Sequence, residues 1–173
     1  MNIFYLSYAF FVQADEWIIS LEITGLGIRH GTPENFSFWT VAASLSDQYI
    51  SGQFTEPFWV EDIEWYITGH YTTIQCAGVY GPNHVLTWVE FMAGNTTPEL
   101  LMWLTWTNVY INPLLSTYTN IIEPVTYIYK ETNINNAWLV NKYWDKPRLK
   151  ILIPPAAPSG VYSGTIIFSF YME

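Results

Sequence analysis

Short runs of β-branched and aromatic residues, separated by glycine, proline and asparagine, recur along this chain and limit the folds that are open to it. In the run WIISLEITG, residues 17–24 alternate between apolar and polar side chains, which is the period of a strand with one buried face. About ten such runs at similar spacing favour an antiparallel sandwich or barrel. We therefore predict an all-β protein, with an immunoglobulin-like or jelly-roll-type β-sandwich as the favoured architecture.

The runs also predict where the strands lie. Strands are expected in FSFWTVA (36–42), FWVEDIEWYIT (58–68), YTTIQCAGV (71–79), HVLTWVEFM (84–92), EPVTYIYKE (123–131), AWLVNKYW (137–144), RLKILIP (148–154) and VYSGTIIFSFYM (161–172). A turn is expected at 81–83, and a loop in GLGIRHGTPEN (25–35). TTPELLMWLTW (96–106) fits a short helix over 98–105 as well as it fits a strand. In the last two runs, alternation predicts that the core-facing residues are Leu149, Ile151, Ile153, Tyr162, Ile166, Phe168 and Phe170.

The chain opens on MNIFYLSYAFFVQ, thirteen residues without a charge. The segment is too short to span a bilayer, which takes about 20 apolar residues, and it lacks the positive charges that begin a secretory signal. Its apolar residues occupy both faces of an extended chain, which is an aggregation hazard unless both faces are buried and the backbone is paired. The sheet that pairs with it is either its own or that of a neighbouring subunit. We divide the chain into an N-terminal arm, residues 1–14, and one sandwich domain, residues 15–173.

The composition indicates a covered surface. Only 12% of the residues are charged, whereas 18% are aromatic. Soluble monomers keep their exposed apolar patches small, so another protein chain, a glycan or a sugar-like ligand is expected to cover part of this surface. The net charge is −9, and it is unevenly spread: residues 1–129 carry −11, whereas residues 130–150 carry +3. Opposite poles suit head-to-tail association, although a solvated face of lysines explains the positive stretch at least as well. An acidic chain is a poor partner for nucleic acid.

Catalytic motifs are absent from the sequence. His30, His70 and His84 are not at metal-ligand spacing, no nucleophile elbow or phosphate-binding loop occurs, and Cys76 reads as a small core residue. We therefore predict no enzyme activity, no cofactor, no metal and no membrane span. The best candidate for a site is an acidic cluster, which could hold calcium or a pair of glycosidase carboxylates and consists of Glu56, Glu61, Asp62 and Glu64.

Other patterns relate to sugars. Aromatic rings stack on pyranose faces, and five rings are spaced so that some are exposed: Trp59, Trp65, Tyr66, Trp103 and Trp106. Core packing or an interface explains these rings better. Two sequons, at Asn35 and Asn95, are glycosylation sites if the protein is exported.

The segments at the two ends of the chain resemble those of a known group of filament-forming proteins. The ending RLKILIPPAAPSGVYSGTIIFSFY and the apolar N-terminal arm are similar to TasA/camelysin-like matrix fibres and archaeal bundling-pilus subunits. The resemblance implies an exported subunit whose N-terminal strand inserts into the sandwich of its neighbour. It makes the donor strand Ile3, Phe4, Tyr5, Leu6, Tyr8, Phe10, Phe11 and Val12. It also assigns to the framework Gly160, Tyr162, Gly164, Ile166 and Phe168.

We therefore expect a structural subunit of an extracellular filament, a pilus or biofilm-matrix-like fibre, which forms a homopolymer by donor-strand complementation and is a possible glycoprotein. The alternatives are a β-sandwich viral coat protein, which gains weight if Met1 is the initiator, and a carbohydrate-binding module.

Overall fold

The structure is a computed structural model. It describes residues 4–11, 28–32, 37–38, 40–42, 44–62, 69–94, 99–100, 109–130, 141–155 and 157–172. Their strands are β1 (Phe4–Phe11), β2 (Ile28–Gly31), β3 (Gln48–Gln53), β4 (Phe58–Asp62), β5 (His70–Gly81), β6 (His84–Leu86), β7 (Val89–Met92), β8 (Glu99–Leu100), β9 (Val109–Ile111), β10 (Thr119–Asn120), β11 (Val125–Lys130), β12 (Asn141–Asp145), β13 (Arg148–Ile153) and β14 (Ser163–Met172). A short 3-10 helix, η1 (Pro113–Ser116), precedes β10.

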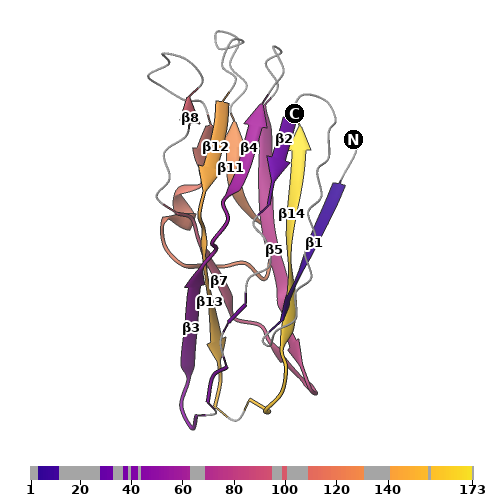
Figure 1. Cartoon of the computed structure of the whole chain (residues 1–173), viewed down its shortest axis with the longest axis vertical. Coiled ribbons are helices and arrows are strands. Elements are labelled where there is room, and N and C mark those ends of the chain that lie inside the picture. The colour runs from indigo at the N-terminus through magenta and orange to yellow at the C-terminus, as the bar shows by residue number, and fades with distance from the viewer. Residues whose placement is uncertain are drawn as a thin grey trace.

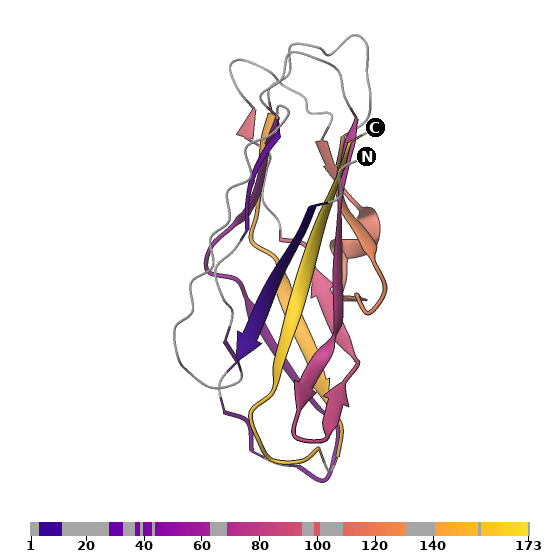
Figure 2. The ribbon, with the colours of Figure 1, turned by 90° about the vertical axis from the view of Figure 1, so that its right-hand side faces the viewer.

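Three antiparallel sheets make two layers (Figures 1 and 2). The first sheet has the strand order β1-β14-β5-β11-β9, and β6 pairs with the far end of β5. The second layer consists of an upper sheet, β2-β4-β12-β8, and a lower sheet, β10-β7-β13-β3. Only two residues separate β12 from β13, and a hydrogen bond of 3.0 Å from Phe54 N to Pro147 O joins the strands where the sheets meet. The second layer therefore runs almost continuously along the molecule.

The core between the layers is centred on aromatic rings. Phe58 lies 5.1 Å from Tyr127 and 5.0 Å from Phe168, between ring centroids. Phe91 contacts Tyr127 edge-on at 5.0 Å. All four rings are buried, and burial of a large apolar side chain contributes about 1.5–3 kcal/mol. Tyr127 is available to this cluster because a bulge in β11 turns it inward beside Ile128.

The sequence-based prediction of an all-β sandwich is confirmed. In β13, Leu149 and Ile151 are buried and Arg148 is exposed, as alternation predicts. The turn at 81–83 joins β5 to β6 and places Asn83 at a φ of 56°. A type II turn requires a positive φ at its third residue and commonly has proline at its second. Asn83 and Pro82 occupy these two positions.

Two segments differ from their predictions. The loop expected over 25–35 contains β2, which pairs with β4 because Gly31 lets the indole of Trp59 lie against the backbone. A Cβ atom at Gly31 would be 2.0 Å from that ring's nitrogen. The strand expected in FSFWTVA is also wrong for its described residues, 37–38 and 40–42, because they contribute Phe38 to the core without joining a strand ladder.

Two further predictions change in detail. HVLTWVEFM forms two strands, because β6 belongs to the first sheet and β7 to the lower sheet, with the crossing at residues 87–88. In TTPELLMWLTW, Glu99–Leu100 form β8, which pairs with β12, so the strand alternative holds there. The remainder of that run lies outside the described residues.

Candidate functional site

The first described strand pairs with the last. Every residue of β1 has a partner in β14, from Phe4 opposite Phe170 to Phe11 opposite Ser163. β14 is itself paired on its other side with β5, so β1 is the outermost strand of the first sheet. Figure 2 shows β1 beside β14 at this margin. The edge is therefore built from an uncharged strand whose ladder, in the part of the chain that the structure describes, is to β14 alone.

The structure places most of the predicted donor strand in β1. Six of its residues fall within this strand: Phe4, Tyr5, Leu6, Tyr8, Phe10 and Phe11. Ile3 and Val12 lie outside the described residues. Within one chain, the arm thus occupies the position of a first strand of its own sandwich.

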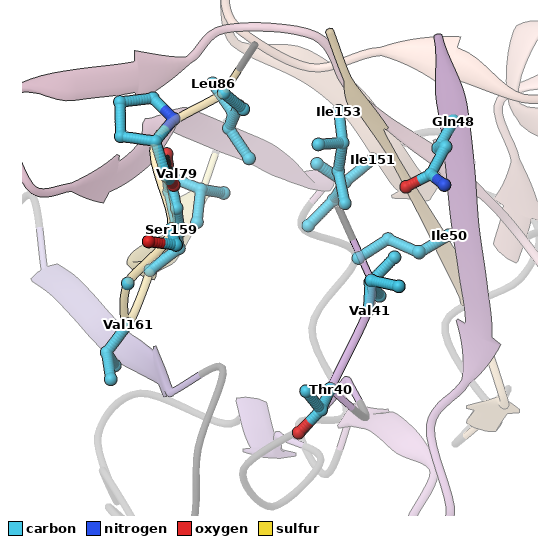
Figure 3. Close-up of a pocket in the computed structure, with 15 residues that line it drawn as sticks. Thr40, Val41, Gln48, Ile50, Val79, Leu86, Ile151, Ile153, Ser159 and Val161 are labelled. Carbon is cyan, nitrogen blue, oxygen red and sulfur yellow. Dashed lines mark hydrogen bonds between the residues drawn. The ribbon is translucent and has the colours of Figure 1, made fainter. Parts of the chain in front are cut away.

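A cavity of about 340 Å³ lies between the layers near the end of β1 (Figure 3). One wall comes from the first sheet and the loop before β14, with Val79, Leu86 and Val161. The opposite wall comes from the lower sheet, with Ile50 and Ile151. The remaining lining residues are Thr40, Val41, Ala42, Gln48, Ile153, Ala157, Pro158, Ser159, Gly160 and Tyr162. None of these side chains carries a charge.

Close packing fixes the wall that leads into β14. The Tyr162 hydroxyl donates a hydrogen bond of 2.8 Å to Pro158 O, which closes the loop on itself. The Tyr162 ring lies against Gly81, where a Cβ atom would be 2.4 Å from the ring. Gly160 approaches Pro82 equally closely, since a Cβ there would be 2.4 Å from the proline ring. The loop is thereby held to the β5–β6 turn, and Gly160, one of the predicted framework residues, has a steric reason to be glycine.

The edge and the cavity adjoin each other. Phe11, the last residue of β1, pairs with Ser163, and Val161 of the cavity wall is two residues before it. The end of β1 therefore lies near the loop that lines the cavity.

A buried polar group lies toward the other end of the first sheet. His70 of β5 and Lys130 of β11 are cross-strand neighbours and are 3% and 5% exposed. Burial, and secondarily the charge of Lys130, lowers the pKa of His70 from an ordinary 6.5 to about 4. Nε2 of His70 and the hydroxyl of Thr72 are buried without a hydrogen-bond partner. His70 is therefore neutral at physiological pH and destabilising when protonated.

A buried hydrogen bond joins the two layers. The Tyr127 hydroxyl, from the bulge of β11, donates a hydrogen bond to the carboxylate of Asp145 at the end of β12. Asp145 is 0% exposed and lies against Gly94, where a Cβ atom would be 2.4 Å from its Oδ1. This contact fixes the point at which the upper and lower sheets meet.

The acidic cluster is not assembled by the described residues. Glu56 is exposed, Glu61 and Asp62 form the end of β4, and Glu64 lies outside the described residues. Among the side chains that the structure describes, no group of three histidine, cysteine, aspartate or glutamate residues is arranged to hold a metal. Cys76 is buried, as predicted. Burial raises the pKa of its thiol, against the smaller effect of its hydrogen bond to Gly78 O.

Of the rings and sequons that were predicted to relate to sugars, only Trp59 lies among the described residues. Trp59 is half-buried, lies against Gly31 and has its ring centroid 6.2 Å from that of Trp144, so it serves packing. The other four predicted rings, Trp65, Tyr66, Trp103 and Trp106, lie outside the described residues, as do Asn35 and Asn95.

Sequence reasoning missed the buried polar residues and the cavity. Lys130 lies two residues after the apolar Ile128, so the alternation of β11 already places it on the core face. No pattern in the sequence predicted the cavity, because its walls come from six separate stretches of the chain.

Among the described residues, no helix has the length and apolar character needed to cross a membrane. Comparisons with protein-family models, with curated proteins and with solved structures found no match for this chain.

Proposed function

We propose that this protein is a structural subunit of an extracellular filament, and that subunits join head to tail by exchange of the N-terminal strand. The observation that carries the proposal is the position of β1: an uncharged strand at a sheet edge, paired along its length with β14. Strand addition and domain swapping both use such an edge.

Exchange of β1 conserves its interactions. The neighbour's β1 takes the same register against β14, so every ladder hydrogen bond, each contributing about 0.5–1.5 kcal/mol, is remade between chains. Because a swapped contact of this kind is heterologous, repetition without closure produces a fibre. The low fraction of charged residues in the chain and their uneven distribution along it are consistent with contacts between copies.

Disulfide trapping tests the exchange directly. Ala9 pairs with Thr165, and paired residues on neighbouring strands have Cα atoms about 4.5–5.5 Å apart, which suits a disulfide. Two separately purified variants, Ala9→Cys and Thr165→Cys, are unfolded together, refolded, allowed to assemble and oxidised. Strand exchange predicts a disulfide between the two different chains. The matched control replaces Thr165→Cys with Ser169→Cys, whose partner is Tyr5, and it should not crosslink.

The double variant Ala9→Cys/Thr165→Cys completes the test. If it forms its disulfide only within one chain, under conditions in which the native protein makes fibres, exchange of β1 is refuted. Electron microscopy of the native protein gives the second readout: closed shells would favour the coat-protein alternative. Deletion of residues 1–13 should abolish fibres and leave a marginally folded monomer.

A further inference from the structure

We propose that the cavity between the β5–β6 hairpin and the lower sheet binds a small, uncharged aliphatic molecule with one hydrogen-bonding end. This site is independent of strand exchange, since its walls come from β3, β5, β6, β13 and the loops beside them.

The chemistry of the walls favours an apolar occupant over water. Ile50, Val79, Leu86, Ile151 and Ile153 face the cavity from the two layers (Figure 3). A water molecule in such a site needs two to four polar partners, and an enclosed apolar cavity of about 150 Å³ is known to stay dry and take up apolar molecules. Empty space in a core also lowers stability, so an occupant stabilises the fold.

Size and charge define the ligand further. A volume of 340 Å³ accommodates on the order of ten non-hydrogen atoms, at about 30 Å³ for each water-sized unit. Among the described residues, no lining side chain is charged, so a carboxylate or ammonium would be desolvated without compensation from them. Gln48, Thr40 and Ser159 supply an amide and two hydroxyls to the lining. Together these residues match a medium-chain alcohol or a similar neutral amphiphile.

The site has an entrance and a fixed wall. Thr40, Ala42 and Ser159 are exposed, and Val161 is 47% exposed, so one side of the cavity is reached from solvent. The loop on that side is held by the Tyr162 hydrogen bond to Pro158 O. A cavity with a held wall needs little ordering on binding, which favours affinity.

A small neutral fluorescent probe, 1-aminonaphthalene, tests the inference on the intact chain in its monomeric form. We expect its emission to shift to shorter wavelength on binding, 1-decanol to displace it, and decanoate at neutral pH to displace it at least about tenfold less well. Two variants fill the cavity from its exposed side, Val161→Trp and Ala42→Trp, and should weaken probe binding about tenfold. Their matched controls, Val85→Trp and Ala77→Trp, are exposed residues outside the lining and should bind like the native protein.

Several results of these experiments would contradict the proposed small-molecule site. The inference is overturned if the probe does not bind, if decanol and decanoate compete equally, or if the controls lose binding as the filled variants do. If a synthetic peptide of residues 1–13 displaces the probe better than decanol, the cavity belongs to a strand of a second copy and the small-molecule site is refuted. Failure of strand exchange in the disulfide experiment would leave this inference unaffected.

Discussion

Acidification should destabilise this protein, and His70 should contribute a measurable part of the loss. Its pKa is about 4 in the folded chain and about 6.5 in the unfolded chain. The unfolded state therefore takes up a proton at higher pH than the folded state does. Stability is complete above the unfolded pKa, falls as the pH drops from about 6.5 towards 4, and loses nothing more from this residue below that.

The magnitude follows from the separation of the two pKa values. The full difference corresponds to about 3 kcal/mol, and about 2.5 kcal/mol of it is lost between pH 7.5 and pH 4.5. That is a large part of the 5–15 kcal/mol typical of a domain. The cause is desolvation first and Lys130 second, so Lys130→Met should raise the folded pKa of His70 only in part.

Urea unfolding of the native protein and of His70→Gln at both pH values measures the effect. Carboxylates add their own pH dependence to both proteins, so the readout is the difference between them. His84→Gln, which keeps His70, is the matched control and should follow the native protein. Histidine NMR gives a direct check, because the chain has three histidines and one should titrate near pH 4. Equal acid sensitivity of the native protein and His70→Gln, together with a normal titration of His70, would refute the reasoning.

Three further predictions concern packing. Tyr127→Phe removes the donor to buried Asp145 and should cost about 1–3 kcal/mol in urea unfolding; an unchanged midpoint would show that the contact contributes nothing. Gly81→Ala places a methyl group against the Tyr162 ring and should lower stability by about 1–3 kcal/mol, whereas Gly81→Ala combined with Tyr162→Leu should recover part of the loss. Cys76 should react with a thiol reagent only after unfolding, because it is buried and the pKa of its thiol is raised; rapid labelling of the folded protein would contradict this.

The strands with regular alternation were predictable from sequence. In β13 and β14 the predicted residues Leu149, Ile151, Ile166 and Phe168 are buried in the core. Ile153 and Phe170 are partly buried and pack against it. β2 was not predicted because glycine is typical of loops. The sequence alone does not show that the Trp59 ring occupies the space beside Gly31. Segment 40–42 has the composition of a strand, but it forms part of the cavity lining and no strand. Its structure therefore depends on tertiary packing, which local composition does not reveal.

Of the candidate site, the sequence predicted only the apolar N-terminal arm. The uncharged character of β1 is evident from the sequence, whereas its partner strand is not, because register depends on where the rest of the sheet ends. His70 and Lys130 fall opposite each other through the register of β5 and β11, which no local pattern encodes.

The pairing of the first strand with the last also has a consequence for biosynthesis. Almost the whole chain lies between β1 and its partner β14, so the ribosome releases the apolar arm long before the strand that covers it exists. Contacts between such distant segments form slowly, and unpaired edges are prone to aggregate in the interval. The nascent arm therefore stays without this partner until β14 has been made, and we expect a holdase-type chaperone to bind the arm in that interval.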